Sequence, residues 1–379
     1  GFVMSLYALY QSDEPLDEIG LRIDQALGGN LCRCTGYRAI KSAALQAMNR
    51  REASQLESVS STPNSEHTVH PGVNKMQRTE KSQMATTARE LGRLAAKKPD
   101  VQGFYQPRTV SELARIYLEN PKMRLLGGGT DLALEVTEQC RKFDGIIHLG
   151  RVRELNLAKV NGESLELGAA VTLTRCLDIL KHRIPGAENM LLRFGSDQIR
   201  NQATVGGNFG SASPIADLPP LLLALNCVLD LQKGDDIRQV PLDNFYTGYR
   251  KTELQPGEFI RTVRVSLPAP DSMFAVHKVS KRRLDDISTV CMAINLPQSD
   301  GKSQGVRLAF GGMAATPIRA TRAEAALEDR VFDNQSVRDA KRALIEELHP
   351  ISDMRASAGY RLQIAQNLLQ RVLMEVTLS

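Results

Sequence analysis

A long polar stretch divides this chain into a short front part and a long back part. Residues 51–85 are rich in Ser, Thr, Glu, Gln and Asn and hold few large apolar side chains, and a basic segment follows at 89–98. Such a sequence buries too little apolar surface to offset the entropy that ordering would cost. We therefore expect a linker over residues 51–100, with separately folded parts at 1–50 and from residue 101 onwards.

Size and charge exclude several classes of protein. With 379 residues, of which 42% are apolar, the chain can form about two or three domains. Its net charge of +5 is spread thinly, which argues against a nucleic-acid partner, because proteins of that class cluster their basic residues. No apolar run approaches the ~20 residues of a membrane helix, and residues 1–10 lack the basic start and the cleavage site of a signal peptide. We expect neither a nucleic acid nor a membrane as partner.

The cysteines indicate a compartment. The chain has six of them, and they form no dense framework of the kind that disulfide-stabilised secreted proteins show. A reducing cytoplasm is the expectation. Four of the six lie in apolar segments, where we expect small buried hydrophobes: Cys140, Cys176, Cys227 and Cys291.

Cys32 and Cys34 differ from the other four. They lie between two expected helices, one that ends at Gly28-Gly29 and one that runs from Thr35, as N-cap, through Met48. Two thiolates one residue apart can bind one soft metal centre, although an iron–sulfur cluster needs four ligands. The spacing alone leaves two interpretations open, half of a metal site or a pair of reduced, unliganded thiols.

Beyond residue 100 the local patterns predict mixed α and β structure. Helices are expected at 110–118, 174–181 and 218–225, and strands at 123–126, 145–149, 164–167 and 228–231. After about residue 268 the pattern changes to strands at 290–296 and 306–310 and helices at 336–347 and 356–375. The last helix has an apolar stripe that predicts a core face: Leu362, Ala365, Leu368, Leu369, Val372 and Leu373. The fold class is α+β with several domains.

Two glycine loops are candidates for a binding site. Gly127-Gly128-Gly129-Thr130-Asp131 follows a strand directly, and Ala203–Asn208 forms a second glycine turn that leads to Asp217. Glycine lets the backbone approach a ligand closely, and successive N–H groups can surround an anion such as a pyrophosphate. Each loop alone could be only a tight turn. Together they indicate a nucleotide-type cofactor spread across two lobes, while the G-x-G-x-x-G and G-x-x-x-x-G-K-[ST] patterns are absent.

Residues 30–37, with residues 1–5 upstream, resemble the second [2Fe–2S] module of the molybdenum hydroxylase family. The resemblance implies that Cys32 and Cys34 supply two of the four ligands of one [2Fe–2S] cluster. It also implies that the other two ligands, and the whole domain of a second cluster, would precede Gly1. We therefore expect the chain to be an N-terminally truncated form of such a protein.

The glycine loops resemble the FAD-binding domain of the same family. The resemblance covers 125–132 and 198–217, and residues 311–320 and 351–358 resemble the domain that follows it. It implies that FAD contacts Leu125, Leu126, Gly127, Gly128, Gly129, Thr130, Asp131, Leu132, Phe194, Thr204, Val205, Gly206, Gly207, Asn208, Asp217, Ile260 and Lys278. Both loops would hold the pyrophosphate, mainly by backbone N–H groups.

The resemblance also implies a domain order. A truncated helical [2Fe–2S] domain would occupy 1–50 and the linker 51–100. A two-lobed α+β FAD-binding domain of the PCMH or vanillyl-alcohol-oxidase-like type would occupy 101–270. An α+β domain similar to the CO dehydrogenase flavoprotein C-terminal domain would occupy 271–379.

Fusion of the iron–sulfur and FAD parts, with the chain ending after them, resembles the small subunit of the bacterial xanthine dehydrogenase branch, as do residues 249–252 and 281–287. This resemblance implies a partner large subunit that carries the molybdenum cofactor and hydroxylates a purine, in a heterotetramer of two small and two large subunits. Electrons would pass through [2Fe–2S] clusters to FAD and then to NAD⁺, with no catalytic residue for hydroxylation on this chain. Asp285 and Asp286 would border the NAD⁺ site or be only surface charges. Two alternatives stay open: a molybdenum hydroxylase for an aldehyde or N-heterocycle, and a flavin-free scaffold or maturation protein.

Overall fold

The computed structural model describes residues 1–12, 18–30, 36–60 and 103–378, which divide into two compact units, Gly1–Phe104 and Tyr105–Ser379. The first unit contains the helices α1 (Phe2–Gln11), α2 (Ile19–Leu27) and α3 (Arg38–Ser60). Its core consists of Ile23, Leu27, Ala44 and Met48. These residues recur at helical spacing on α2 and α3, so each helix contributes one apolar face. The helices expected on either side of the two cysteines are confirmed, while Cys32, Cys34 and the expected N-cap Thr35 lie outside the described residues.

Helix α3 extends further than we expected. It continues to Ser60, whereas the linker was expected from residue 51. The added residues include Arg, Glu, Ala, Gln and Leu and contain neither Gly nor Pro, so their helix propensity is good. Low apolar content at 51–60 therefore did not mean an absence of regular structure.

The second unit begins with a small three-stranded sheet of order β1-β3-β2. Its strands are β1 (Phe104–Tyr105), β2 (Arg124–Leu126) and β3 (Ile146–His148), and β2 pairs with β3 in parallel. Between β1 and β3 the chain forms α5 (Val110–Glu119) and α6 (Leu132–Thr137). The side chain of Thr109 caps α5 by accepting from the backbone N–H of Glu112. The first glycine loop is thus placed between the end of β2 and the start of α6.

A five-stranded antiparallel sheet of order β4-β5-β10-β6-β7 forms the larger lobe. The strands are β4 (Ala158–Asn161), β5 (Ser164–Gly168), β6 (Val228–Lys233), β7 (Asp236–Pro241) and the central β10 (Glu258–Ser266). Alternate residues such as Leu167, Leu229 and Val263 are buried in the core. The intervening positions carry charge, where Arg264 of β10 pairs with Asp230 and Glu166 on its two neighbours. This alternation gives the sheet one apolar and one polar face.

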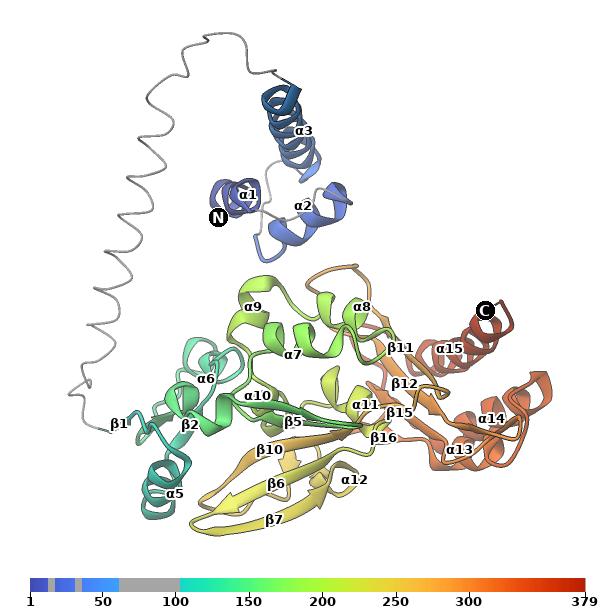
Figure 1. The fold of residues 1–379 in the computed structure, drawn as a ribbon. Coiled ribbons are helices and arrows are strands. Elements are labelled where there is room, and N and C mark those ends of the chain that lie inside the picture. The colour runs from blue at the N-terminus through green and yellow to red at the C-terminus, as the bar shows by residue number, and fades with distance from the viewer. Residues whose placement is uncertain (13–17, 31–35, 61–102, 379) are drawn as a thin grey trace, which may run out of the picture. The chain divides into compact units, whose positions relative to one another are not determined.

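Short helices cover the apolar face of this sheet (Figure 1). They are α7 (Leu173–Leu180), α8 (Ala187–Leu192), α9 (Asp197–Gln202), α10 (Val205–Gly210) and α11 (Leu218–Leu223). The chain connects these parts through η1 (Leu149–Arg151), η2 (Glu154–Asn156), α12 (Leu242–Phe245), β8 (Tyr246–Gly248) and β9 (Lys251–Thr252).

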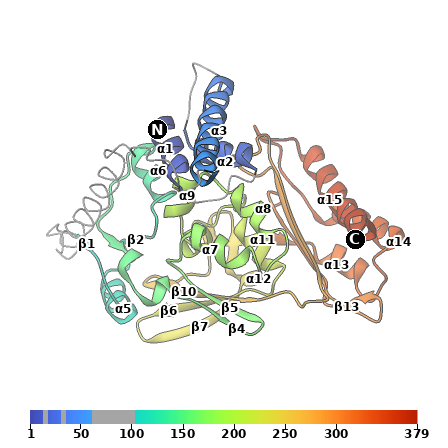
Figure 2. The same ribbon diagram turned by 45° about the horizontal axis from the view of Figure 1, so that its top comes forward.

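The C-terminal domain has a four-stranded antiparallel sheet of order β11-β12-β15-β16. The strands are β11 (Met273–Val279), β12 (Val290–Leu296), β15 (Arg307–Gly311) and β16 (Ile318–Arg319), with a hairpin β13 (Gln298–Ser299) and β14 (Lys302–Ser303). Helices α13 (Thr321–Leu327), α14 (Asn334–Glu347) and α15 (Ala358–Leu378) follow. Figure 2 shows these helices on one side of the sheet and α11 on the other.

Side-chain size differs between the two faces of this sheet. Large residues such as Met292, Ile294 and Phe310 form a core with α13–α15, and the apolar stripe expected on the last helix belongs to that core. The alternate positions Ala293 and Ala309 belong instead to the core of the larger lobe. We call this lobe, which contains the five-stranded sheet and the helices that cover it, the FAD-type lobe. A Cβ on Gly311 would come within 3.0 Å of Cγ of Pro220 and 3.1 Å of the Ala216 carbonyl oxygen. Small residues therefore let α11 pack closely against β12 and β15, and we call this contact the α11 seam.

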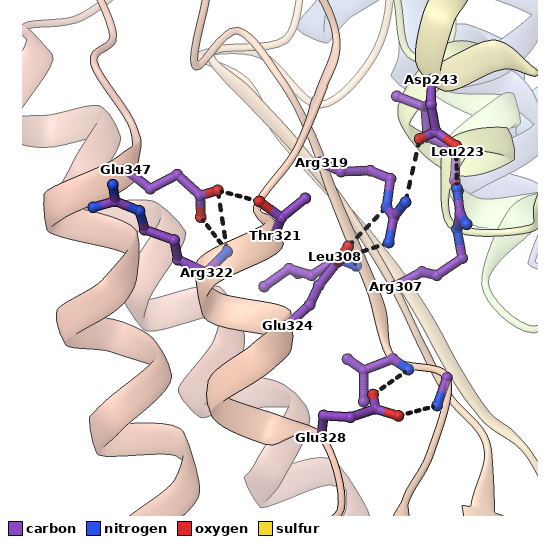
Figure 3. Close-up of polar contacts among 12 residues, drawn as sticks. Leu223, Asp243, Arg307, Leu308, Arg319, Thr321, Arg322, Glu324, Glu328 and Glu347 are labelled. Carbon is purple, nitrogen blue, oxygen red and sulfur yellow. Dashed lines mark hydrogen bonds and ion pairs between the residues drawn. The ribbon is translucent and has the colours of Figure 1, made fainter.

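Charged side chains extend the attachment at the edge of the α11 seam (Figure 3). Arg307 donates to Asp243 on α12 (2.7 Å) and to the carbonyl oxygen of Leu223 on α11 (2.8 Å). Arg319 pairs with the same Asp243 and with the buried Glu324, which also accepts from the backbone N–H of Leu308. Two arginines of the C-terminal domain thus bind one carboxylate of the preceding domain.

Exposure of the four isolated cysteines differs from our expectation at one position. Cys176, Cys227 and Cys291 are buried as expected, and burial raises the pKa of the Cys176 thiol to about 12. Cys140 is exposed, so that expectation was wrong. It lies in the turn after α6 with φ 52°, among charged neighbours that keep the segment at the surface. In the part of the chain that the structure describes, no helix combines the length and the apolarity needed to span a bilayer.

The α11 seam should tolerate no added volume. Ala293→Leu places three extra carbons on the face that meets α11, and we expect it to lower the free energy of unfolding by about 1–3 kcal/mol. Ala325→Leu on the exposed side of α13 is the matched control and should change it by less than about 0.5 kcal/mol. Urea unfolding followed by circular dichroism measures both, and equal effects would show that the seam is loosely packed.

Candidate functional site

The two glycine loops lie directly against each other. A Cβ on Gly127 would come within 2.7 Å of Oγ1 of Thr204, and one on Gly128 within 1.6 Å of the carbonyl oxygen of Gln202. Gly129 has φ +76°, a conformation that residues with a side chain rarely adopt. The first loop can approach the second this closely only because these positions lack side chains. The expectation that two distant glycine motifs form one site is therefore supported by their direct contact.

Backbone donors are arranged differently in the two loops. In the second loop the N–H groups bond within the protein: Val205 to Val171, Gly206 to Ala169, and Gly207 and Asn208 to Thr204. In the first loop the N–H groups of Gly128, Gly129 and Thr130 donate to no other residue that the structure describes. A pyrophosphate would therefore meet free donors in the first loop, whereas the second loop uses its own donors to fix its shape. This differs from the sequence-based expectation that both loops bind through backbone N–H groups.

Asn208 offers a further polar group beside these loops. Its amide oxygen is buried and has no hydrogen-bond partner in the protein, a condition that costs free energy unless a ligand supplies a donor. Thr204, which is 7% exposed, caps α10 and contacts the Gly127 position. Free N–H groups, glycines in close contact and an unpaired buried acceptor are features of a site built for a polar ligand. The residues present fit a dinucleotide such as FAD.

Asp217 and Lys278 form a buried ion pair. The ammonium nitrogen of Lys278 lies 2.7 Å from Oδ2 of Asp217, and the side chains are 2% and 5% exposed. Ser288 donates to the other carboxylate oxygen. Asp217 is the N-cap of α11 and Lys278 lies on β11, so the pair crosses the α11 seam. Two residues predicted separately as cofactor contacts are thus also partners of each other.

The remaining predicted contacts lie in the same unit. Leu125 and Leu126 form the end of β2, Asp131 occupies the N-cap position of α6 without a capping bond from its side chain, and Leu132 begins that helix. Ile260 is 6% exposed in the core beside a β-bulge of β10. Phe209 of α10 is fully buried in the same core.

Phe194 is half-buried and is held by a neighbouring arginine. The guanidinium Nη1 of Arg200 donates to the carbonyl oxygens of Leu192, Phe194 and Gly195 at 3.0–3.1 Å. Arg200 is only 3% exposed, so these bonds are shielded from water. The turn that presents Phe194 is therefore fixed from inside the fold.

A basic loop follows β11 and contacts the turn before Phe194 through Arg193. We define the basic loop as residues 280–287, which include Lys281, Arg282, Arg283, Asp285 and Asp286. A cavity of about 410 Å³ is lined by Asn189, Arg193, Ser280, Lys281, Arg282 and Arg283. Although burial acts to raise it, the pKa of Asp286 is lowered by hydrogen bonds from the N–H groups of Arg282 and Ile287. This carboxylate holds the basic loop together, and the structure does not show Asp285 or Asp286 in contact with the glycine loops.

Three residues of this region were not found from the sequence. Ser288, Arg193 and Arg200 each bind a predicted site residue or its neighbour, but none belongs to a glycine loop. Arg200 stands inside the Gln198–Asn201 segment that the resemblance marked, so its charge next to a cofactor loop was an available signal. Nothing in the local sequence of Ser288 or Arg193 distinguishes them from surface residues.

Lys278→Met should test the buried pair. It leaves the carboxylate of Asp217 buried without its counter-charge, so we expect a loss of about 3–5 kcal/mol in the free energy of unfolding. Arg115→Met breaks the exposed Arg115–Glu119 pair and should cost at most about 0.5 kcal/mol. The double variant Asp217→Leu/Lys278→Met should recover part of the loss. Denaturant unfolding measures all three, and a loss for Lys278→Met no larger than that for Arg115→Met would contradict a buried ion pair.

Three protein families match successive parts of the chain. The [2Fe-2S] binding domain matches residues 1–45, the FAD binding domain in molybdopterin dehydrogenase matches 98–270, and the CO dehydrogenase flavoprotein C-terminal domain matches 275–376. The order is the one that the sequence predicted.

Known proteins resemble the chain over different lengths. Xanthine dehydrogenase of Emericella nidulans is 28% identical over 92% of this chain, which spans 28% of that protein's length. The xanthine dehydrogenase FAD-binding subunit of Escherichia coli O157:H7 is 27% identical over 73% of this chain and 96% of the subunit. A chain of carbon monoxide dehydrogenase from Hydrogenophaga pseudoflava superimposes with a TM-score of 0.67 at 26% identity, over 73% of this chain and 96% of that one. With its [2Fe–2S] domain, its FAD-binding domain and its flavoprotein C-terminal domain in this order, the chain belongs to the molybdenum hydroxylase family.

Proposed function

We propose that this chain is the FAD and iron–sulfur electron-transfer subunit of a xanthine dehydrogenase. A large subunit that carries the molybdenum cofactor would hydroxylate a purine, in a heterotetramer of two small and two large subunits in the cytoplasm. Electrons from that reaction would reach FAD on this chain through [2Fe–2S] clusters, with Cys32 and Cys34 as ligands of one cluster. NAD⁺ would be the final acceptor.

The observation that most strongly supports FAD binding is the contact between the two glycine loops. It places three free N–H groups of the first loop beside the rigid second loop and the unpaired amide of Asn208. FAD, when bound, supplies the ability to exchange one or two electrons. Gly128, Gly129 and Thr130 would hold its pyrophosphate by donating hydrogen bonds, and the amide oxygen of Asn208 would accept one from a donor group of FAD outside the pyrophosphate.

The xanthine dehydrogenase assignment rests on the extent of similarity. The similarity to the Emericella enzyme covers 92% of the chain, and therefore includes the iron–sulfur part and the FAD part in one continuous alignment. The similarity to the carbon monoxide dehydrogenase chain covers 73%. Fusion of the two parts is thus shared with the Emericella xanthine dehydrogenase, although not with the separate FAD-binding subunit of the Escherichia coli enzyme, and this supports a purine as substrate of the partner.

NAD⁺ as acceptor is supported by the charge beside the site. The cavity next to the Phe194 turn is lined by Arg193, Lys281, Arg282 and Arg283, and arginine and lysine are suited to bind phosphate groups. Asp285 and Asp286 belong to the same basic loop. A dinucleotide with its pyrophosphate in this cavity would lie near the residue proposed to contact the flavin.

A molybdenum hydroxylase with another substrate is the second candidate. The structural likeness to carbon monoxide dehydrogenase favours it, because the FAD and C-terminal domains are common to both. Residues of this chain would then hold FAD in the same way, while the partner's pocket would admit an aldehyde or an N-heterocycle. Turnover of hypoxanthine by the assembled complex would distinguish the two candidates.

The first experiment is the visible absorption spectrum of the purified chain, with NADH then added in the absence of oxygen. We expect a flavin band, present as isolated or after FAD is added, that bleaches on addition of NADH. A band that NADH leaves unchanged would contradict NAD⁺ as acceptor. If the chain retains no flavin band after FAD has been added and the unbound excess removed, this result would contradict the flavoprotein assignment and favour the scaffold alternative.

Gly128→Ala should weaken FAD binding. Its Cβ would collide with the backbone oxygen of Gln202, so the two loops would have to separate and the free donors would move. We expect the affinity for FAD to fall at least about tenfold, which corresponds to about 1.4 kcal/mol. Gly359→Ala on α15, where an added Cβ meets nothing within 4 Å, is the matched control. Quenching of flavin fluorescence on titration measures both affinities, and equal affinities would contradict the loop contact as the basis of binding.

A further inference from the structure

Arg193 connects the turn before Phe194 to the basic loop through three separate hydrogen bonds. Its Nε donates to the carbonyl oxygen of Arg283 (3.0 Å), its Nη1 to that of Lys278 (2.7 Å), and its Nη2 to Oγ of Ser280 (3.0 Å). The acceptors are the end of β11 and two points of the basic loop, eighty-five to ninety residues further along the chain. Each nitrogen of one planar guanidinium therefore fixes a different part of the same segment.

The anchor behind Arg193 is rigid. Arg193 is the C-cap of α8, and at the other end of that helix Gly186 approaches β11 so closely that a Cβ would lie 3.1 Å from Cγ1 of Val276. On its C-terminal side Phe194 is fixed by the buried Arg200. The guanidinium of Arg193 thus extends from a segment, α8 and the Phe194 turn, that is held at both ends by other contacts.

The basic loop itself has few other attachments. Within the loop, Ser280 donates to the carbonyl oxygen of Arg282, and Asp286 accepts from the backbone N–H of Arg282. Lys281 donates to the carbonyl oxygen of Met354 before α15. The side chains of Lys281, Arg282 and Arg283 are exposed, and Asp285 has a positive φ of 49°. Internal bonds shape the loop, but the bonds from Arg193 fix it against the FAD-type lobe.

We propose that Arg193 is a positioning residue that holds the basic loop in one conformation beside the Phe194 turn and thereby forms the cavity between them. The cavity of about 410 Å³ is lined by Arg193 and by Ser280–Arg283, so release of the loop would dissolve one of its walls. The assignment of this cavity to a dinucleotide rests on the proposed function. The role of Arg193 in positioning the loop rests only on its three hydrogen bonds.

Lysine cannot replace arginine in this role. The three acceptors are reached by three nitrogens spread over a rigid plane, whereas an ammonium group is a single centre at the end of a flexible stem. Arg193→Lys would keep the charge and reach only part of the acceptor set. Loss of positioning in this variant would therefore separate geometry from charge.

Trypsin tests the position of the loop directly, because Lys281, Arg282 and Arg283 are its cleavage sites. In the folded 379-residue chain we expect Arg193→Ala to raise the rate of cleavage at these residues about tenfold, since the loop loses two hydrogen bonds that hold it in place and the end of β11 loses a third. Arg193→Lys should give an intermediate rate. Arg183→Ala, which removes an exposed arginine whose Nη1 donates to a carbonyl oxygen of its own segment, is the matched control and should be cleaved at the wild-type rate.

A milder variant guards against misfolding. Ser280→Ala leaves α8 and Arg193 intact and removes one acceptor of Arg193 together with the bond from Ser280 to the carbonyl oxygen of Arg282, so we expect a smaller increase in cleavage with an unchanged melting temperature. Wild-type cleavage rates in both Arg193→Ala and Ser280→Ala would overturn the proposal. Faster cleavage spread over the whole chain, instead of at residues 281–283, would also overturn it, because the role of Arg193 would then be general stability.

Kinetics test the consequence for the dinucleotide. With NADH as electron donor and ferricyanide as acceptor, we expect Arg193→Ala to raise the KM for NADH about tenfold, while kcat changes less. A tenfold change in affinity corresponds to about 1.4 kcal/mol of binding free energy. Arg193→Lys should restore only part of the affinity. An unchanged KM together with faster cleavage would overturn the role of the loop in dinucleotide binding. Failure of NADH to reduce the wild-type flavin would instead refute the proposed acceptor, and the trypsin result would still decide whether Arg193 positions the loop.

Discussion

Close packing of α11 against the sheet of the C-terminal domain is the contact on which the arrangement of the site depends. The helix starts at Asp217, and small residues at 293, 309 and 311 let it approach the strands. Because Lys278 of the sheet neutralises Asp217 inside this contact, neither charge can be buried without the other. The pair therefore ties the register of β11 to the start of α11. A FAD-type lobe without the C-terminal domain would leave a buried carboxylate unpaired and an apolar helix face open to water.

This seam also explains why a domain that carries no glycine loop contributes to the site. The Lys278–Asp217 pair joins β11 to the start of α11, and the end of that strand lies at the C-terminus of α8, where Arg193 binds Lys278, Ser280 and Arg283. The turn that presents Phe194 then lies between two arginines, Arg200 from its own lobe and Arg193 toward the basic loop. The Asp217–Lys278 ion pair is thus the start of a series of contacts that reaches the Phe194 turn and the basic loop. The electron transfer between flavin and nicotinamide that we propose would need this kind of fixed mutual position, because both would have to be held in contact while water is kept out.

Local patterns predicted the elements well, and long-range contacts much less. A strand that runs into three glycines, and an apolar stripe at helical spacing in the last helix, depend only on neighbours in sequence, so β2 and α15 could be recognised. The central strand β10 was missed although Phe259, Val263 and Val265 alternate with polar residues; the two charged residues Arg261 and Arg264 obscure that signal. The partnership of Asp217 with Lys278 joins residues 61 positions apart, and no periodicity encodes it. The same holds for Arg193, whose acceptors are mostly backbone oxygens that any sequence would offer.

The two glycine loops show why a motif does not by itself define a binding mode. From the sequence both loops look alike, since each offers consecutive small residues after a strand or turn. In the fold the second loop donates its N–H groups to Val171, Ala169 and Thr204, because it forms the N-cap and first turn of α10 and must satisfy its own buried backbone. The first loop lies at the edge of a three-stranded sheet and keeps its donors free. Glycine thus permits close packing in both loops, while only the first loop keeps N–H groups that could donate to a ligand, and the path of the surrounding backbone decides which loop does so.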